Sequence, residues 1–110
     1  MKFIEAYIPP DALDEVRTLL RARGIEDLVA SEMALEIGEH ERLYWESATA
    51  NLIPQLKLEL AVSDDQASST AHDIFNAVST RRAKRRVQIL ISPLEDVVRI
   101  ETGQHGSAAL

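Results

Sequence analysis

The sequence predicts an α+β domain whose elements follow the order β-α-β-β-α-β. Two observations carry this prediction. Four segments are apolar or alternate between apolar and polar residues, as strands do, and two others repeat apolar residues at helical spacing. A proline pair, a glycine and a serine–aspartate sequence stand at boundaries between these segments. This order is that of the ferredoxin-like fold, in which two helices cover one face of a sheet.

The first strand is predicted at Lys2 to Ile8, and Pro9-Pro10 ends it because proline cannot continue a ladder. Asp11 is predicted to cap the helix that follows, and Gly24 suits its end. The apolar stripe of this helix has four members: Leu13, Val16, Leu19 and Leu20.

A long connection separates the next two strands, which are predicted at Leu28 to Ile37 and at Leu56 to Val62. Gly38 to Ile53 joins them, and a loop of that length in a compact domain is usually functional.

The second helix is predicted to begin at a capping box, Ser63-Asp64-Asp65-Gln66. Val87 to Ile91 is short and apolar, which favours a buried central strand, and Leu94 to Arg99 is expected to form a helical turn. The expected buried face of the second helix has five members: Ala67, Ala71, Ile74, Phe75 and Val78.

Length and composition indicate one domain over residues 1–110. The absence of cysteine excludes disulfides and thiolate sites, and there is no apolar run long enough to span a membrane. The net charge of −6 argues against nucleic-acid binding. A start without the features of a signal peptide, together with the absence of cysteine, favours a cytoplasmic protein. Two helices leave one sheet face bare, and its apolar residues predict an oligomer.

A basic run, Arg81 to Arg86, carries five positive charges, which leaves −11 for the rest of the chain. It is either a solvated loop or a clamp for phosphate groups, since guanidinium binds phosphate oxygens in pairs. The phosphate clamp is slightly favoured, and contact with a membrane or nucleic acid is disfavoured by the acidic remainder. His40, His72 and His105 are scattered, so neither a metal site nor a catalytic constellation is predicted.

Three segments resemble the PII signal-transduction family: the start Met1 to Pro10, the stretch Pro54 to Leu60, and the close Ile91 to Gly103. The resemblance implies a non-enzymatic trimer that binds an adenine nucleotide between neighbouring chains. It also implies that the T-loop of the family, here residues 38–53, reports the nucleotide state to a transporter or an enzyme. The basic run, residues 81–86, falls on the B-loop.

The resemblance further assigns site residues. Arg99 falls on the first of two phosphate-contacting arginines, and Tyr7, Glu59 and Ala61 fall on positions around the nucleoside. The nucleotide site implied in this way has nine members: Tyr7, Gly38, Glu59, Ala61, Arg82, Arg85, Arg86, Gln88 and Arg99.

Departures from the family pattern change the expected ligands. Gln88 replaces the B-loop lysine and Glu101 replaces the second arginine, so ADP or AMP is expected rather than ATP. Gln55 replaces the lysine that pairs with 2-oxoglutarate, and no glutamine matches the one that helps to hold that ligand. The chain therefore resembles an atypical branch, for which bicarbonate is a candidate second ligand and inorganic-carbon metabolism a candidate pathway.

Four alternatives stay open. One is a PII protein of the nitrogen-regulatory type, and another is a PII-like protein linked to metal efflux. The third is a CutA-like trimer that handles divalent metals, supported by His40 and by loop acids at Glu36, Glu39, Glu41 and Glu46. The fourth is an ACT-like small-molecule module, which has no need for the basic run.

Overall fold

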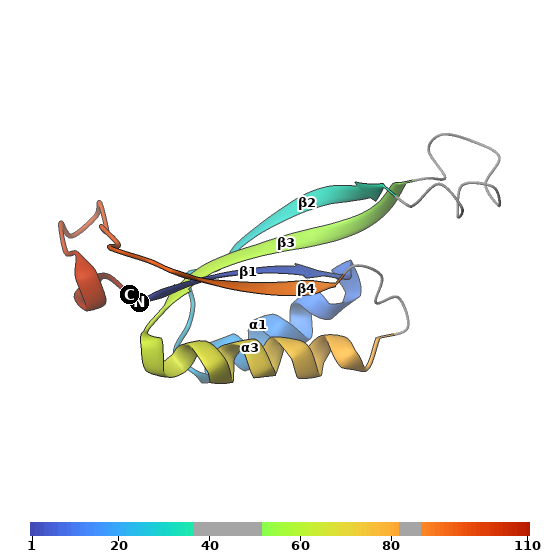
Figure 1. Cartoon of the computed structure of the whole chain (residues 1–110), viewed down its shortest axis with the longest axis horizontal. Coiled ribbons are helices and arrows are strands. Elements are labelled where there is room, and N and C mark those ends of the chain that lie inside the picture. The colour runs from blue at the N-terminus through green and yellow to red at the C-terminus, as the bar shows by residue number, and fades with distance from the viewer. Residues whose placement is uncertain (37–51, 82–86) are drawn as a thin grey trace.

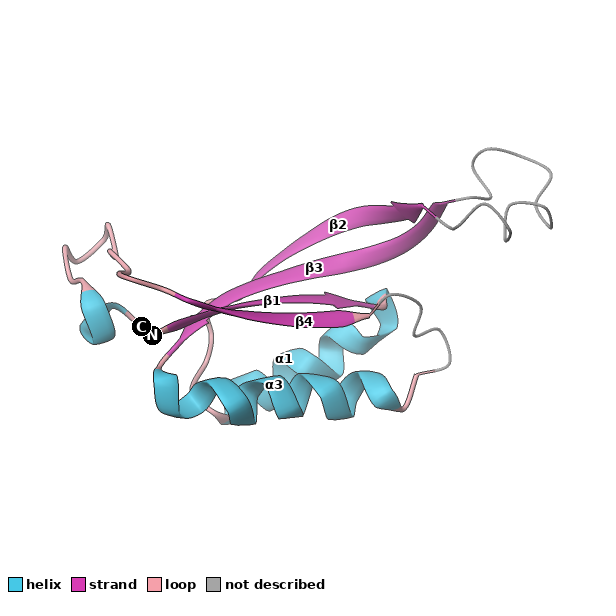
Figure 2. Ribbon diagram, in the orientation of Figure 1, coloured by secondary structure: helices cyan, strands magenta, loops and turns pink. Residues whose placement is uncertain are grey.

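The computed structural model describes residues 1–36, 52–81 and 87–110. Within these ranges the strands form one antiparallel sheet of order β2-β3-β1-β4, and α1 and α3 lie side by side on one face of it (Figures 1 and 2). The α+β class and the ferredoxin-like βαββαβ order are thus confirmed. The elements are β1 Lys2–Ile8, η1 Pro10–Ala12, α1 Leu13–Ala22, β2 Val29–Glu36, β3 Leu52–Val62, α3 Asp64–Ser79, β4 Gln88–Pro93 and η3 Gly106–Ala109.

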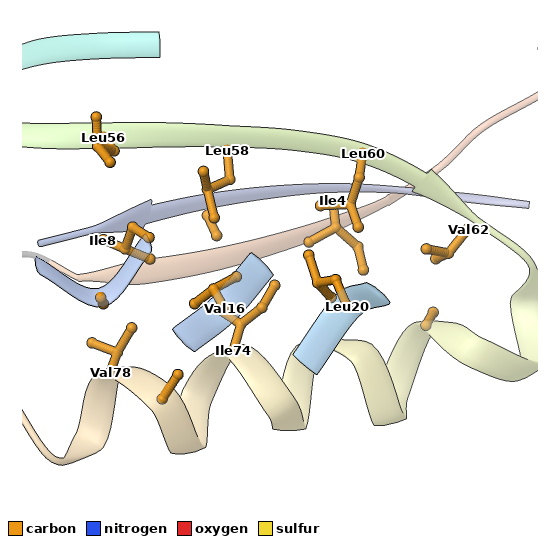
Figure 3. Packing of buried hydrophobic residues seen from close by; sticks show 14 residues of the cluster. Ile4, Ile8, Val16, Leu20, Leu56, Leu58, Leu60, Val62, Ile74 and Val78 are labelled. Carbon is orange, nitrogen blue, oxygen red and sulfur yellow. The ribbon is translucent and has the colours of Figure 1, made fainter. Parts of the chain in front are cut away.

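The core lies between the two central strands and the two helices (Figure 3). Ile4 pairs with Leu60 across β1 and β3, and Ile8 pairs with Leu56. Side chains alternate along a strand, so one register turns all these residues towards the helices. The largest fully buried side chains are Ile4, Ile8, Leu20, Leu58, Ile74, Val16 and Thr70.

Helix α1 ends as predicted and begins differently. Gly24 has φ +79°, its N–H donates to the Arg21 carbonyl at 2.9 Å, and the Ile25 N–H donates to the Leu20 carbonyl at 2.9 Å. This is a Schellman ending, which favours glycine. Asp11 does not cap the helix, because it lies inside the 3₁₀ turn that Pro10 begins, and α1 starts only at Leu13.

Helix α3 is rotated relative to the expected face. Ala67, Ile74 and Val78 are buried, but Phe75 is 59% exposed, and Thr70 and Ala77 are buried in addition. The expected capping box is also wrong. Ser63 is the N-cap residue, yet its side chain makes no capping bond, and its backbone carbonyl accepts the Gln66 N–H at 3.1 Å.

Strand β3 is four residues longer than predicted, since Leu52 and Ile53 belong to it rather than to the loop. Pro54 lies within the strand opposite Ala34 of β2. Strand β1 pairs with β3 only as far as Leu56, so the proline stands where just one neighbour is hydrogen-bonded. Strand β2 matches its prediction within one residue, and residue 37 lies outside the described ranges.

Strand β4 is an edge strand and not the buried central strand that its apolar sequence predicted. It pairs only with β1, and Leu90 and Ile91 are nearly half exposed. An apolar run alone does not distinguish a central strand from an edge strand. The helical turn expected at Leu94 to Arg99 is also wrong: Val98 pairs with His105 in a short hairpin. In the described ranges no helix is long and apolar enough to cross a bilayer.

Adjacent positions on α3 test this packing. Ile74→Ala should lower the free energy of unfolding by about 2–5 kcal/mol, because the change leaves a cavity beneath the sheet. Phe75→Ala, at an exposed position, should lower it by about 1 kcal/mol or less. Urea denaturation at one protein concentration measures both values, and equal losses would contradict the orientation of α3.

Candidate functional site

A cleft of about 800 Å³ lies at the end of the sheet where the C-terminal segment folds back. Its walls come from the turn after α1, from the end of β3 and from residues 97–110. Three residues of the predicted nucleotide site line it: Glu59, Ala61 and Arg99. The structure therefore brings these three together, although Arg99 is 40 positions from Glu59 in the sequence.

Arg99 is held by the C-terminal hairpin. Its backbone N–H donates to the Gln104 carbonyl at 2.8 Å, and its carbonyl accepts the Gly103 N–H at 2.8 Å. The guanidinium donates from Nε and Nη2 to the Ala109 carbonyl at 3.2 and 3.0 Å, and Nη2 also bonds the Asp27 carboxylate. This bond with Asp27 and its negative charge raise the pKa of Arg99, which therefore stays cationic.

The cleft is acidic despite its two arginines. Arg23 is paired with Asp73 of α3, with Nη2 and Oδ1 3.2 Å apart, and this partner raises the pKa of Arg23. Glu26, Asp27 and Glu59 supply three carboxylates to the lining. Both arginines of the lining thus have carboxylate partners within the chain, and the charged residues there sum to −1.

A polar row crosses the bare face of the sheet from the cleft towards the other end of β1. Lys57 Nζ lies 3.8 Å from Glu59 Oε1 and 4.0 Å from Glu5 Oε2. Tyr7 Oη lies 3.5 Å from the same oxygen of Glu5. These side chains share one face because β1 and β3 pair Glu5 with Glu59 and Tyr7 with Lys57.

The rest of the predicted site lies elsewhere in the chain. Tyr7 pairs with Gln88 where β1 ends and β4 begins, and this end of the sheet is opposite the C-terminal hairpin (Figure 1). Gly38, Arg82, Arg85 and Arg86 lie outside the described residues. One chain therefore gathers Glu59, Ala61 and Arg99 in the cleft and places Tyr7 and Gln88 apart from them.

Two further charged residues, Arg81 and Asp96, make structural contacts that the sequence did not predict. Arg81 is the member of the basic run that the structure describes, and its Nη2 donates to Glu15 Oε2 at 2.8 Å, which joins α3 to α1. Asp96 lies in the segment Leu94 to Arg99, which was expected to form a helical turn. Its Oδ1 instead accepts the N–H groups of Val97 and Gly106 at 2.8 Å and holds the C-terminal segment.

Asp27 is the residue that sequence reasoning missed. An aspartate in a polar turn before a strand has no feature that separates it from a solvated acid. Its role becomes visible only when the fold places Arg99, which lies 72 positions later, against it.

The described histidines have no metal-ligand arrangement. His72 stacks with Phe75, with ring centroids 6.4 Å apart, and His105 Nδ1 lies 3.9 Å from Asp96 Oδ2. Among the described residues, no three His, Cys, Asp or Glu side chains converge on a point that suits a metal ion. His40 and the acids at 39, 41 and 46 are outside that part of the chain.

Comparisons with known proteins identify the family. The family model described as "Nitrogen regulatory protein P-II" matches residues 1–104. A nitrogen regulatory protein P-II of Cereibacter sphaeroides is 35% identical over 114 residues, and one of Microchaete diplosiphon is 35% identical over 113, each comparison covering both chains fully. Nitrogen regulatory protein P-II 2 of Methanothermobacter thermautotrophicus is 30% identical over 113 residues, which cover all of this chain and 97% of that protein.

The fold and these matches define a regulatory signalling protein. The chain belongs to the nitrogen regulatory protein P-II family. Members of this family are trimeric, act on partner proteins and are signal-transduction proteins rather than enzymes.

Removing the Arg99 side chain should loosen the C-terminal segment. We expect Arg99→Ala to raise hydrogen exchange at the amides of Gly106 and Leu110 by about fivefold, because two bonds to the Ala109 carbonyl are lost. NMR-detected exchange measures this. The control is Arg17→Ala, which removes an exposed cation from α1 and should leave these amides unchanged. If these amides exchanged as slowly in Arg99→Ala as in the wild type, the hairpin alone would hold the C-terminal segment.

Proposed function

We propose that this chain forms a homotrimer that senses an adenine nucleotide, ADP or AMP in preference to ATP. Bicarbonate is the proposed second ligand. The trimer would regulate a partner, such as a membrane transporter or an enzyme, through the loop at residues 38–53. Inorganic-carbon metabolism is the proposed pathway, and residues 1–110 act as one domain.

The division of the site residues within one chain carries this proposal. Arg99 and Ala61 line the cleft at one end of the sheet, and Tyr7 and Gln88 pair at the other. A second chain, packed against the bare face, would bring the cleft of one molecule to the Tyr7 end of its neighbour. The exposed apolar side chain of Leu90, which lies opposite Glu5 on the bare face of the edge strand, favours such a contact.

The charges around the cleft support a nucleotide with few phosphates. Glu101 contributes a negative charge near Arg99, and Gln88, at the position of the family lysine, carries none. Each further phosphate adds negative charge that these residues do not neutralise. A small monovalent anion such as bicarbonate needs fewer cations than a dicarboxylate, and arginines of the run 81–86 would supply them.

Nitrogen regulation is the second candidate function. The relatives favour it, since all those described above are nitrogen regulatory proteins. Gln55 argues against the usual 2-oxoglutarate signal, because it is 5% exposed and neutral where the family has a lysine. Binding of 2-oxoglutarate therefore separates the two functions.

The proposed assembly has a direct test. Light scattering coupled to gel filtration should give three times the chain mass of 12.3 kDa at micromolar concentration. A monomer at that concentration would remove the shared site from which the function is argued.

Calorimetry tests the ligands. ADP should bind, and Arg85→Ala with Arg86→Ala should weaken it by on the order of 1–3 kcal/mol per lost charged hydrogen bond. The matched control is Arg17→Ala with Arg21→Ala, which removes two exposed cations from α1 and should leave ADP affinity unchanged. With ADP present, bicarbonate should bind and 2-oxoglutarate should not. Micromolar binding of 2-oxoglutarate would favour nitrogen regulation, and binding of Cu²⁺ without ADP would favour the metal-associated alternative.

A further inference from the structure

Asp27 already forms an ion pair with Arg99, one of the two arginines that line the cleft. Arg99 Nη2 bonds the Asp27 carboxylate, and the same guanidinium donates to the Ala109 carbonyl. A guanidinium has donors for both partners but a single positive charge. An anionic ligand that reaches Arg99 must therefore share this charge with Asp27 or displace the carboxylate.

Other carboxylates near Arg99 disfavour the anionic ligand in this competition with Asp27. Glu101 adds a second negative charge near Arg99, and Glu26 lines the same cleft. The other arginine of the lining, Arg23, is engaged with Asp73. No described residue of the lining thus offers a cation free of a carboxylate partner to an incoming phosphate group.

We infer that Asp27 is a specificity-determining residue that limits the number of phosphate groups the cleft accepts. It serves as an internal substitute for a phosphate on Arg99. A ligand with one phosphate group is repelled by the Asp27 carboxylate through that group alone. Every further phosphate group adds negative charge to the ligand and so increases the repulsion. The inference rests on the proposed nucleotide binding and adds to it the residue that sets the preference among AMP, ADP and ATP.

The test removes the charge of Asp27 and keeps its shape. Asp27→Asn retains an oxygen that accepts a bond from Arg99, so the C-terminal segment stays in place. Asp14→Asn is the matched control, since it makes the same charge change on the outer face of α1, where Asp14 pairs with Arg17. Calorimetry with AMP, ADP and ATP is run on both variants and the wild type, and thermal melting verifies that each variant is folded.

We expect Asp27→Asn to tighten ATP binding roughly three- to tenfold more than AMP binding, an effect limited by solvent screening at an exposed carboxylate. Asp14→Asn should leave the ratio of the two affinities unchanged. Binding of ATP by Asp27→Asn alone, with none by the wild type, would support the inference equally.

Two results would overturn the inference and leave nucleotide binding intact. Equal changes for all three nucleotides would show that Asp27 does not discriminate by phosphate number. Weaker binding in Asp27→Asn would show that the carboxylate contacts the ligand favourably. A failure of every nucleotide to bind the wild type and Asp27→Asn is a different outcome, because it removes the proposed function and the inference with it.

Discussion

The pairing register of β1 with β3 is the constraint on which the rest of this structure depends. Ile4 lies opposite Leu60 and Glu5 opposite Glu59, so neighbouring residues face opposite sides of the sheet. One side builds the core under α1 and α3, and the other carries the polar row and Ala61. A slip of one residue would bury the charges and expose the core, which makes this register strongly specified.

The same register explains why a small core leaves a functional surface. Two helices cover one face of the sheet, and the other face keeps Glu5, Lys57 and Glu59 partly exposed. These partly exposed charges stabilise one another, because Lys57 lies between the carboxylates of Glu5 and Glu59. The face thus combines a polar row with an exposed apolar side chain at its edge, Leu90, which lies opposite Glu5. Such a mixture suits a specific assembly better than non-specific association.

At the cleft, the bonds of Arg99 to Asp27 and to the Ala109 carbonyl give this arginine a structural role. Arg99 holds the C-terminal segment through Ala109 and is neutralised by Asp27. A cation with these partners contributes to the shape of the cleft before any ligand arrives. Its availability for an anion is then governed by the carboxylates around it and not by its presence alone.

The sequence by itself determined the order of the elements, the alternation of β1 and β3, the end of α1 at Gly24 and the family. These depend on neighbours within a few residues or on motifs, which a sequence displays directly. Only the tertiary structure decided that β4 is an edge, that Phe75 faces outward and that Asp27 meets Arg99. Each of these depends on contacts between segments distant in the chain, and neither periodicity nor capping preference encodes which distant side chain a residue meets.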